Sequence, residues 1–196
     1  MKIGIFGGTF DPIHNAHISI AKYAKKEYEL DRLIIMPCGN PPHKTTITDK
    51  YIRYKMAKMA SGDDFEVSDF EISRQEYSYT LFTLTYFKEK YPDDKLYLII
   101  GEDSLRDINK WYRPNEIIKL CALLVFPRTD MSSLQKEIQI VQERLGGEIY
   151  PISAPIMKIS STDIRKRIQM GQNISEIVPE NVAEYIEEND VYTNRD

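Results

Sequence analysis

Long apolar runs, cysteines and histidines are all scarce in this chain of 196 residues. No apolar stretch approaches the roughly 18 residues that span a bilayer, so we expect no membrane association. The first residues lack the pattern of a signal peptide, because their apolar run is short and contains glycine. A cytoplasmic location is therefore expected. The two cysteines, Cys38 and Cys121, lie far apart beside likely strands, which favours reduced thiols over a disulfide.

An excess of basic charge is also lacking. The net charge of −4 argues against a general nucleic-acid binder. Basic residues are nevertheless clustered in residues 38–58 and 158–167, whereas residues 176–190 hold six acids and no base. Two basic islands in an acidic chain suit a small anionic ligand. A solvated helix face is the alternative, and it explains Lys55 and Lys58 adequately.

The chain does contain a regular alternation of short apolar runs with longer amphipathic segments. The expected strands are Lys2–Phe6, Arg32–Pro37, Phe65–Val67, Leu96–Ile100, Ala122–Phe126 and Glu148–Ile152. The expected helices are His17–Tyr28, Asp49–Ala60, Thr80–Lys90, Leu134–Leu145 and a last helix that starts at Pro179. This order predicts one α/β domain over residues 1–196, with a doubly wound, mainly parallel sheet and helices on both faces. In such sheets, ligands bind beyond the carboxyl ends of the strands.

The most informative stretch is Gly7–His17, which follows directly on the first expected strand. The order of strand, glycine turn and helix entry is how α/β proteins build a phosphate site. Glycines let the backbone come close, and the helix N-terminus presents free N–H groups. His14 and His17 then lie at i and i+3 on one face of the first turn. Two imidazoles beside an anion site indicate chemistry on a phosphate.

The third histidine, His43, lies in the loop that follows the second expected strand. The loops after parallel strands meet at one edge, so all three histidines are expected to face one crevice. Helix-cap or surface positions are one alternative for them. A three-histidine metal site is another, but no carboxylate lies at ligand spacing, so we expect no protein-held metal.

The second constellation is Ile159–Arg165, where hydroxyl groups precede an amphipathic turn. It predicts a further helix N-terminus and a further anion site. Arg165 lies one turn inside, within reach of a phosphate. The alternative is that Ser161 or Thr162 is an ordinary N-cap and Arg165 a surface residue. No Ser/His/Asp or Cys/His arrangement is evident, so the constellations together predict direct displacement at phosphorus on a polyphosphate substrate.

Together these motifs resemble those of the HxGH nucleotidyltransferases, and most closely the bacterial nicotinate-nucleotide adenylyltransferases. The resemblance covers almost the whole chain, and Ala16 departs from it by replacing the glycine usual between the two histidines. The matching segments, in chain order, are Gly7–His17, Gly39–Lys44, Ser78–Thr80, Gly101–Ser104, Trp111–Tyr112 and Ile159–Arg165.

The resemblance implies a Rossmann-like fold and a role in NAD biosynthesis. The implied reaction joins ATP, accompanied by Mg²⁺, to nicotinate mononucleotide and gives deamido-NAD and pyrophosphate. The implied catalytic residues are His14, His17 and Arg165. The implied ATP-binding residues are Gly8, Thr9, Phe10, Asp103, Ser161 and Thr162. The implied mononucleotide-binding residues are Asn40, His43, Lys44, Thr80, Trp111 and Tyr112. For Trp111, a half-buried packing role is the alternative.

Other readings stay open at this point. A related transferase acting on phosphopantetheine or a small phospho-alcohol shares the opening motif. A non-catalytic nucleotide sensor on the same fold and a metal-dependent hydrolase are further candidates. Preference for the acid over the amide rests on the resemblance alone, and the oligomeric state is open, a homo-oligomer included. The apolar stripe of Val182, Tyr185 and Ile186 favours core packing over an interface.

Overall fold

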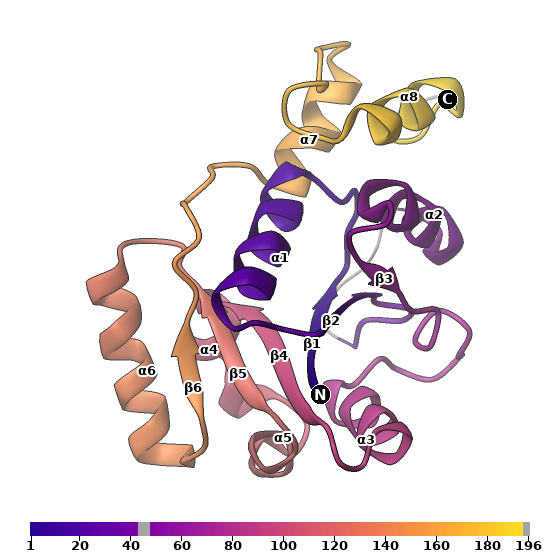
Figure 1. Cartoon of the computed structure of the whole chain (residues 1–196). Helices are drawn as coiled ribbons and strands as arrows, with labels where there is room; N and C mark the ends of the chain where they lie inside the picture. The colour runs from indigo at the N-terminus through magenta and orange to yellow at the C-terminus, as the bar shows by residue number, and fades with distance from the viewer. Residues whose placement is uncertain (43–47, 194–196) are drawn as a thin grey trace.

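A six-stranded sheet lies at the centre of the computed structural model, which describes residues 1–42 and 48–193 (Figure 1). Its strands are β1 (Lys2–Gly8), β2 (Arg32–Pro37), β3 (Glu66–Val67), β4 (Lys95–Gly101), β5 (Ala122–Phe126) and β6 (Ile149–Pro151). They pair in the order β3-β2-β1-β4-β5-β6, and every pairing is parallel. The predicted parallel, doubly wound sheet is confirmed, and its order reverses between β1 and β4.

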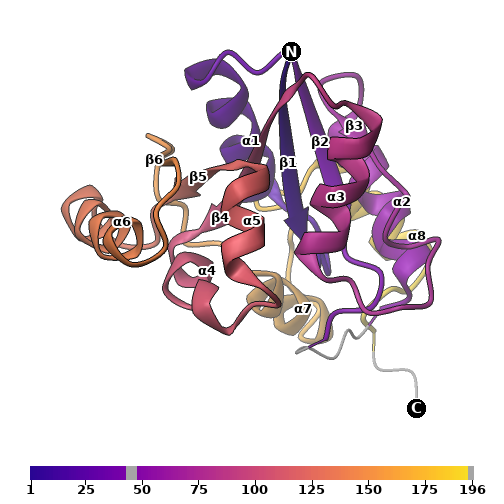
Figure 2. The same ribbon diagram turned by 90° about the horizontal axis from the view of Figure 1, so that it is seen from below.

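Helices cover both faces of this sheet. One face packs against α1 (Asn15–Glu27), α2 (Lys50–Ser61), α7 (Ser161–Gln169) and α8 (Glu180–Glu188). The other packs against α3 (Thr80–Lys90), α4 (Glu102–Arg106), the 3₁₀ turn η1 (Ile108–Lys110), α5 (Pro114–Leu120) and α6 (Met131–Leu145). The helices α2 and α8 lie side by side in both views (Figures 1 and 2). In Figure 1, α7 and α8 lie beyond the carboxyl ends of the strands.

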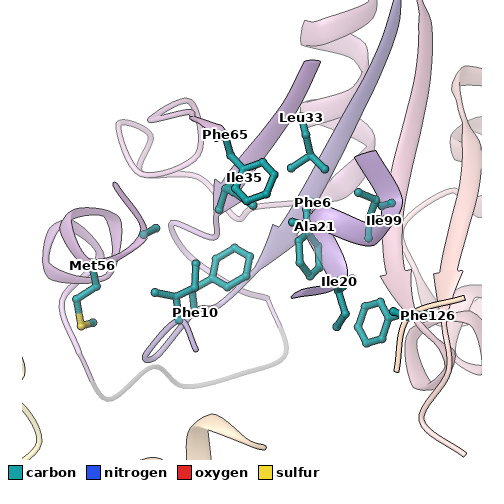
Figure 3. Packing of buried hydrophobic residues seen from close by; sticks show 14 of the residues in the cluster. Phe6, Phe10, Ile20, Ala21, Leu33, Ile35, Met56, Phe65, Ile99 and Phe126 are labelled. Carbon is teal, nitrogen blue, oxygen red and sulfur yellow. The ribbon is translucent and has the colours of Figure 1, made fainter. Parts of the chain in front are cut away.

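Successive residues of each strand point to opposite faces of the sheet and so join two separate hydrophobic cores. Phe6 and Ile35 join the cluster under α1 (Figure 3), whereas Ile5 and Ile34 join the cluster on the opposite face. Strands buried on both faces therefore read as continuous apolar runs. Val182 and Ile186 of α8 are also buried in the first cluster, and Tyr185 packs against it, so the predicted core role of this stripe is confirmed.

Several predicted bounds coincide with the structure, among them β2, β5 and α3. The first helix begins at Asn15, two residues earlier than expected, with His14 as its N-cap. Pro179 is the N-cap of α8, which itself begins at Glu180, so the predicted start is wrong by one residue. No helix in the described part of the chain is long and apolar enough to cross a membrane.

Candidate active site

A cavity of about 350 Å³ lies at the carboxyl ends of β1 and β4, where the strand order reverses. This is the position at which doubly wound sheets bind ligands. Seven of the predicted site residues line it, namely Gly8, Thr9, Phe10, His17, Thr80, Asp103 and Trp111. The structure thus brings the β1–α1 region, the start of α3 and the segment that follows β4 to one cavity.

The two histidines of the opening motif stack face to face. Their ring centroids are 3.6 Å apart, with 18° between the planes. The backbone N–H of His14 donates to Nδ1 of His17 over 3.2 Å. Because Nδ1 of His17 accepts this bond, a neutral His17 carries its proton on Nε2. The side chain of His17 is one of those that line the cavity.

His14 differs from His17 in its burial. Its side chain belongs to a residue that is only 4% exposed, and its Nδ1 has no hydrogen-bond partner among the described residues. Burial, helped by the positive charge of Arg128, lowers the pKa of His14 to about 4. At neutral pH His14 is therefore an uncharged imidazole, and its side chain is not among those that line the cavity.

The β1–α1 loop is shaped by an aromatic ring. Phe10 has a positive φ of 50° and is 2% exposed, with its ring edge-to-face against Phe6 and His17. A Cβ at Gly8 would lie 2.7 Å from the Phe10 ring. Gly8 is therefore needed so that Phe10 can pack beneath the loop, which gives this glycine a structural reason besides the predicted approach of a phosphate.

The first turn of α7 differs from the expected cap. Ser160 is the N-cap, and its Oγ accepts from the backbone N–H of Asp163 over 3.1 Å. The alternative that Ser161 or Thr162 caps this helix is therefore wrong. Both lie one or two positions further on, in the first turn. Their backbone N–H groups are among the groups that a helix leaves without intrahelical partners.

Helix α7 is tied to the β1–α1 loop by two side chains. Ser161 Oγ donates to the carbonyl of Pro12 over 2.9 Å, and Arg165 Nη1 donates to the carbonyl of Asp11 over 2.7 Å. Nη2 of Arg165 also donates to Thr162 Oγ1. The two predicted anion-binding helix starts therefore meet at one loop, and Arg165 is held there rather than free on the surface.

Arg53 is a site residue that the sequence reading missed. It comes from the basic island of residues 38–58, yet it is fully buried. Its guanidinium donates to the carbonyls of Thr9 over 2.6 Å, Thr48 over 3.2 Å and Gly39 over 3.4 Å. Burial lowers the pKa of Arg53, and the charge of Asp11 opposes that shift. One buried cation thus joins the loops that follow β1 and β2.

Arg128 is a second missed residue, at the end of β5. Its side chain lines the cavity and makes an ion pair with Asp103 over 3.4 Å. Its backbone N–H donates to the carboxylate of Glu102, which is fully buried and also pairs with Arg106. Asp103, the expected ribose ligand, is therefore already engaged by a cation in this structure.

Cys38 and Glu71 both line the cavity. Burial raises the pKa of Cys38 to about 12, and burial also raises the pKa of Glu71, whose carboxyl accepts from Thr83 Oγ1 over 2.6 Å. A thiol with such a pKa stays protonated and is a poor nucleophile. Cys38 and Cys121 are both free thiols, as predicted.

The expected mononucleotide side is only partly assembled. Ser78 Oγ accepts from the backbone N–H groups of Gly39 and Asn40, each over 3.1 Å, which brings the β2 loop against the start of α3. Trp111 is half-buried, packs against the core under α3 and α5, and still lines the cavity, so both of its expected roles are compatible with its place.

Two of the predicted mononucleotide ligands that the structure describes, Asn40 and Tyr112, are not among the residues that line the cavity. Tyr112 is 39% exposed and lies against Tyr79 and Phe82. His43 and Lys44 lie outside the described residues.

A second cavity, of about 260 Å³, adjoins the first beside α1 and α7. Ala16, Phe126, Arg128 and Ser160 are among its lining residues. The Ala16 methyl group, which replaces the usual glycine, therefore faces this space. Within the described residues, no three His, Cys, Asp or Glu side chains lie close enough together to hold a metal ion.

Known proteins resemble this chain in sequence. The model of the cytidylyltransferase-like family matches residues 5–167. A probable nicotinate-nucleotide adenylyltransferase of Clostridium novyi is 43% identical over 91% of this chain and 92% of its own length. A protein of the same description from Clostridium botulinum (strain Eklund 17B) is 44% identical over 97% of this chain and 98% of its own.

Solved structures show the same fold. The nicotinic acid mononucleotide adenylyltransferase of Plasmodium falciparum, complexed with NaAD, superimposes with a TM-score of 0.81 at 22% identity, covering 97% of each chain. A structure of that protein complexed with APC gives a TM-score of 0.75 at 21% identity, over 97% of this chain and 96% of the other.

Proposed function

The chain belongs to the nicotinate-nucleotide adenylyltransferases of the cytidylyltransferase-like family, and from this premise we propose that it transfers the adenylyl group of ATP to nicotinate mononucleotide. The products are deamido-NAD and pyrophosphate. The observation that carries the proposal is the junction of α7 with the β1–α1 loop, where Arg165 and Ser161 bond the carbonyls of Asp11 and Pro12. This junction joins two helix N-termini and a cation beside the stacked histidines, which suits a triphosphate.

The 5′-phosphate of the mononucleotide attacks the α-phosphorus of ATP in line, and pyrophosphate leaves. The Nε2–H of His17 donates to the phosphate oxygens as charge develops on them. His14 supports them as a neutral imidazole, and Arg165 holds the leaving pyrophosphate. Cys38, protonated by burial, supports a mechanism without a covalent intermediate.

The remaining predicted residues bind substrate. The backbone of Gly8, Thr9 and Phe10 and the first turn of α7 at Ser161 and Thr162 cradle the phosphates. Mg²⁺ arrives as part of the MgATP substrate, held by phosphate oxygens and water, which suits a site whose described residues offer it no carboxylate cluster.

Asp103 accepts from the adenosine ribose, exchanging its pairing with Arg128 for a hydroxyl group. For the mononucleotide, the proposed phosphate ligands are Asn40, His43 and Lys44, and the proposed ring contacts are Thr80, Trp111 and Tyr112.

The test is pyrophosphate release from MgATP with each of four additions: nicotinate mononucleotide, its amide, phosphopantetheine, and no acceptor. Release strongly favouring the acid is the expected result. Release favouring the amide would keep the reaction type and overturn the assignment of the ring site. Release with phosphopantetheine alone would assign the chain to the related transferases. ATP binding without release would favour a nucleotide sensor.

A further inference from the structure

The segment that follows α8 folds back onto the β1–α1 loop. Tyr192, with a positive φ of 70° and 9% exposure, donates its phenol hydrogen to Asp11 Oδ1 over 2.8 Å. The two residues are 181 positions apart in the sequence, and Asp11 is 4% exposed. Figure 1 shows α8 beside α2, at the same end of the molecule as the start of α7.

Asp11 is held through two of its groups at once. Its side-chain carboxylate accepts from Tyr192, and its backbone carbonyl accepts from Arg165 Nη1 over 2.7 Å. On the same loop, buried Arg53 holds the carbonyl of Thr9 over 2.6 Å. The phenol therefore helps to fix the peptide group on which Arg165 rests. Burial raises the pKa of Tyr192, so the phenol remains a donor throughout the ordinary assay range.

A merely packing role would not need this bond. A phenylalanine ring fills nearly the same space as a tyrosine ring, whereas a phenol buried against a carboxylate must keep its partner in place to avoid an unsatisfied polar group. The bond joins the last described segment of the chain to the loop that carries the phosphate site. Because Arg165 bonds the Asp11 carbonyl, a bond from Tyr192 that fixes Asp11 also fixes the position of the Arg165 guanidinium.

We propose that Tyr192 is a positioning residue for adenylyl transfer: by holding the Asp11 carboxylate, it keeps the Asp11 carbonyl where Arg165 must rest to face the triphosphate. The inference rests on the proposed function. It adds the C-terminal segment to the machinery that places the cation for the leaving pyrophosphate.

The test compares Tyr192→Phe with Tyr185→Phe. Tyr185 lies on α8 and packs against the same cluster, so its variant removes a hydroxyl nearby without affecting the Asp11 bond. We expect Tyr192→Phe to lower kcat per active site about tenfold, the scale of one hydrogen bond to a charged group, with a melting temperature lower by only a few degrees. Tyr185→Phe should keep kcat within about twofold.

The double variant with Arg165→Ala identifies the route. Because Tyr192 acts through Arg165, adding Tyr192→Phe to Arg165→Ala should cost less than about twofold more. Losses that multiply in the double variant, or an unchanged kcat per active site with a lower melting temperature, would overturn the inference and leave a structural role. If wild-type protein releases no pyrophosphate in the four-way comparison above, the proposed function itself fails, so the two failures are distinguishable.

Discussion

The two ends of the parallel strands differ in how they hold ionisable side chains. At the carboxyl ends, Asp11, His14, Arg53, Glu71 and Glu102 are all buried. At the amino ends, charge is carried by exposed pairs: Lys95 with Glu148 joins the start of β4 to the start of β6, and the side chains are 47% and 50% exposed.

Exposed ion pairs and buried ionisable groups contribute differently to the protein. Exposed pairs contribute little to stability, because water screens them. Burying an ionisable group is costly unless partners compensate, as Tyr192 does for Asp11 and three backbone carbonyls do for Arg53. Their concentration at one edge of the sheet is the physical sign that this edge binds and reacts. We therefore expect substitutions at the carboxyl ends of the strands to change turnover strongly and substitutions at the amino ends to change it little.

The largest effect is expected at His17. In the variant His17→Ala, turnover should fall about 10³-fold, because the N–H that faces developing charge is lost, while the affinity for ATP changes by less than about threefold. Steady-state kinetics and calorimetric ATP titration measure the two quantities. Equal losses in turnover and in ATP affinity would remove the transition-state role.

His14 provides a pH test of the buried edge. The pKa of His14 is 6.5 in the unfolded chain and about 4 in the folded protein. Between pH 4 and pH 6.5, the unfolded chain therefore binds a proton that the folded protein does not bind. The free energy of unfolding should therefore fall by up to about 3 kcal/mol as pH drops from about 6.5 to about 4, with no contribution above that window.

Denaturant unfolding of the wild type and His14→Gln at pH 7, 5.5 and 4.5 measures this contribution. The wild type should lose more stability on acidification than the variant, which lacks the titrating group. Parallel losses in the two proteins would show that His14 titrates normally.

Arg165 should give the next effect. Its guanidinium is held on the Asp11 carbonyl, from which it faces the triphosphate. Arg165→Ala should raise the barrier of the reaction by roughly 2–3 kcal/mol, as for a lost hydrogen bond to a charged group, measured as kcat/KM for ATP. Lys166→Ala on the same helix is the matched control. Kinetics equal to that control would discard the assignment of Arg165.

The smallest effect is expected at the amino ends. Lys95→Ala removes one exposed pair, so the free energy of unfolding should change by less than about 1 kcal/mol. Turnover should stay at the wild-type value, and added salt should abolish the difference in stability. A marked loss of turnover in this variant would break the contrast between the two ends.

The sequence was sufficient for the parts of the molecule that depend on local pattern. Apolar runs located the strands, and the spacing of His14 and His17 placed both imidazoles on one helix turn. The short helices α4 and α5 were missed because they have too few turns for a clear apolar period. Ser160 was missed as the cap because three hydroxyl residues stand in a row, and only the backbone path selects one.

Contacts between distant segments could not be read in the same way. The apolar period of the second helix indicates Ile52, Met56 and Met59 as inward residues. The structure fully buries Met56 and also Arg53, whereas Ile52 and Met59 are only partly buried. Arg53 lies one turn before Met56, near the buried face of the helix, yet its three carbonyl partners come from the two loops that follow β1 and β2. For the same reason, only the path of the folded chain brings Arg128 to the cavity and Tyr192 to Asp11.

The most direct test of the account is the stereochemical course at the ATP α-phosphorus. The measurement uses ATP with one sulfur of known chirality at that phosphorus and nicotinate mononucleotide as the acceptor, and it determines the configuration in the dinucleotide product. We expect inversion, because a single in-line displacement passes through no covalent intermediate. Retention would require two displacements through an enzyme-bound adenylyl group and would contradict it.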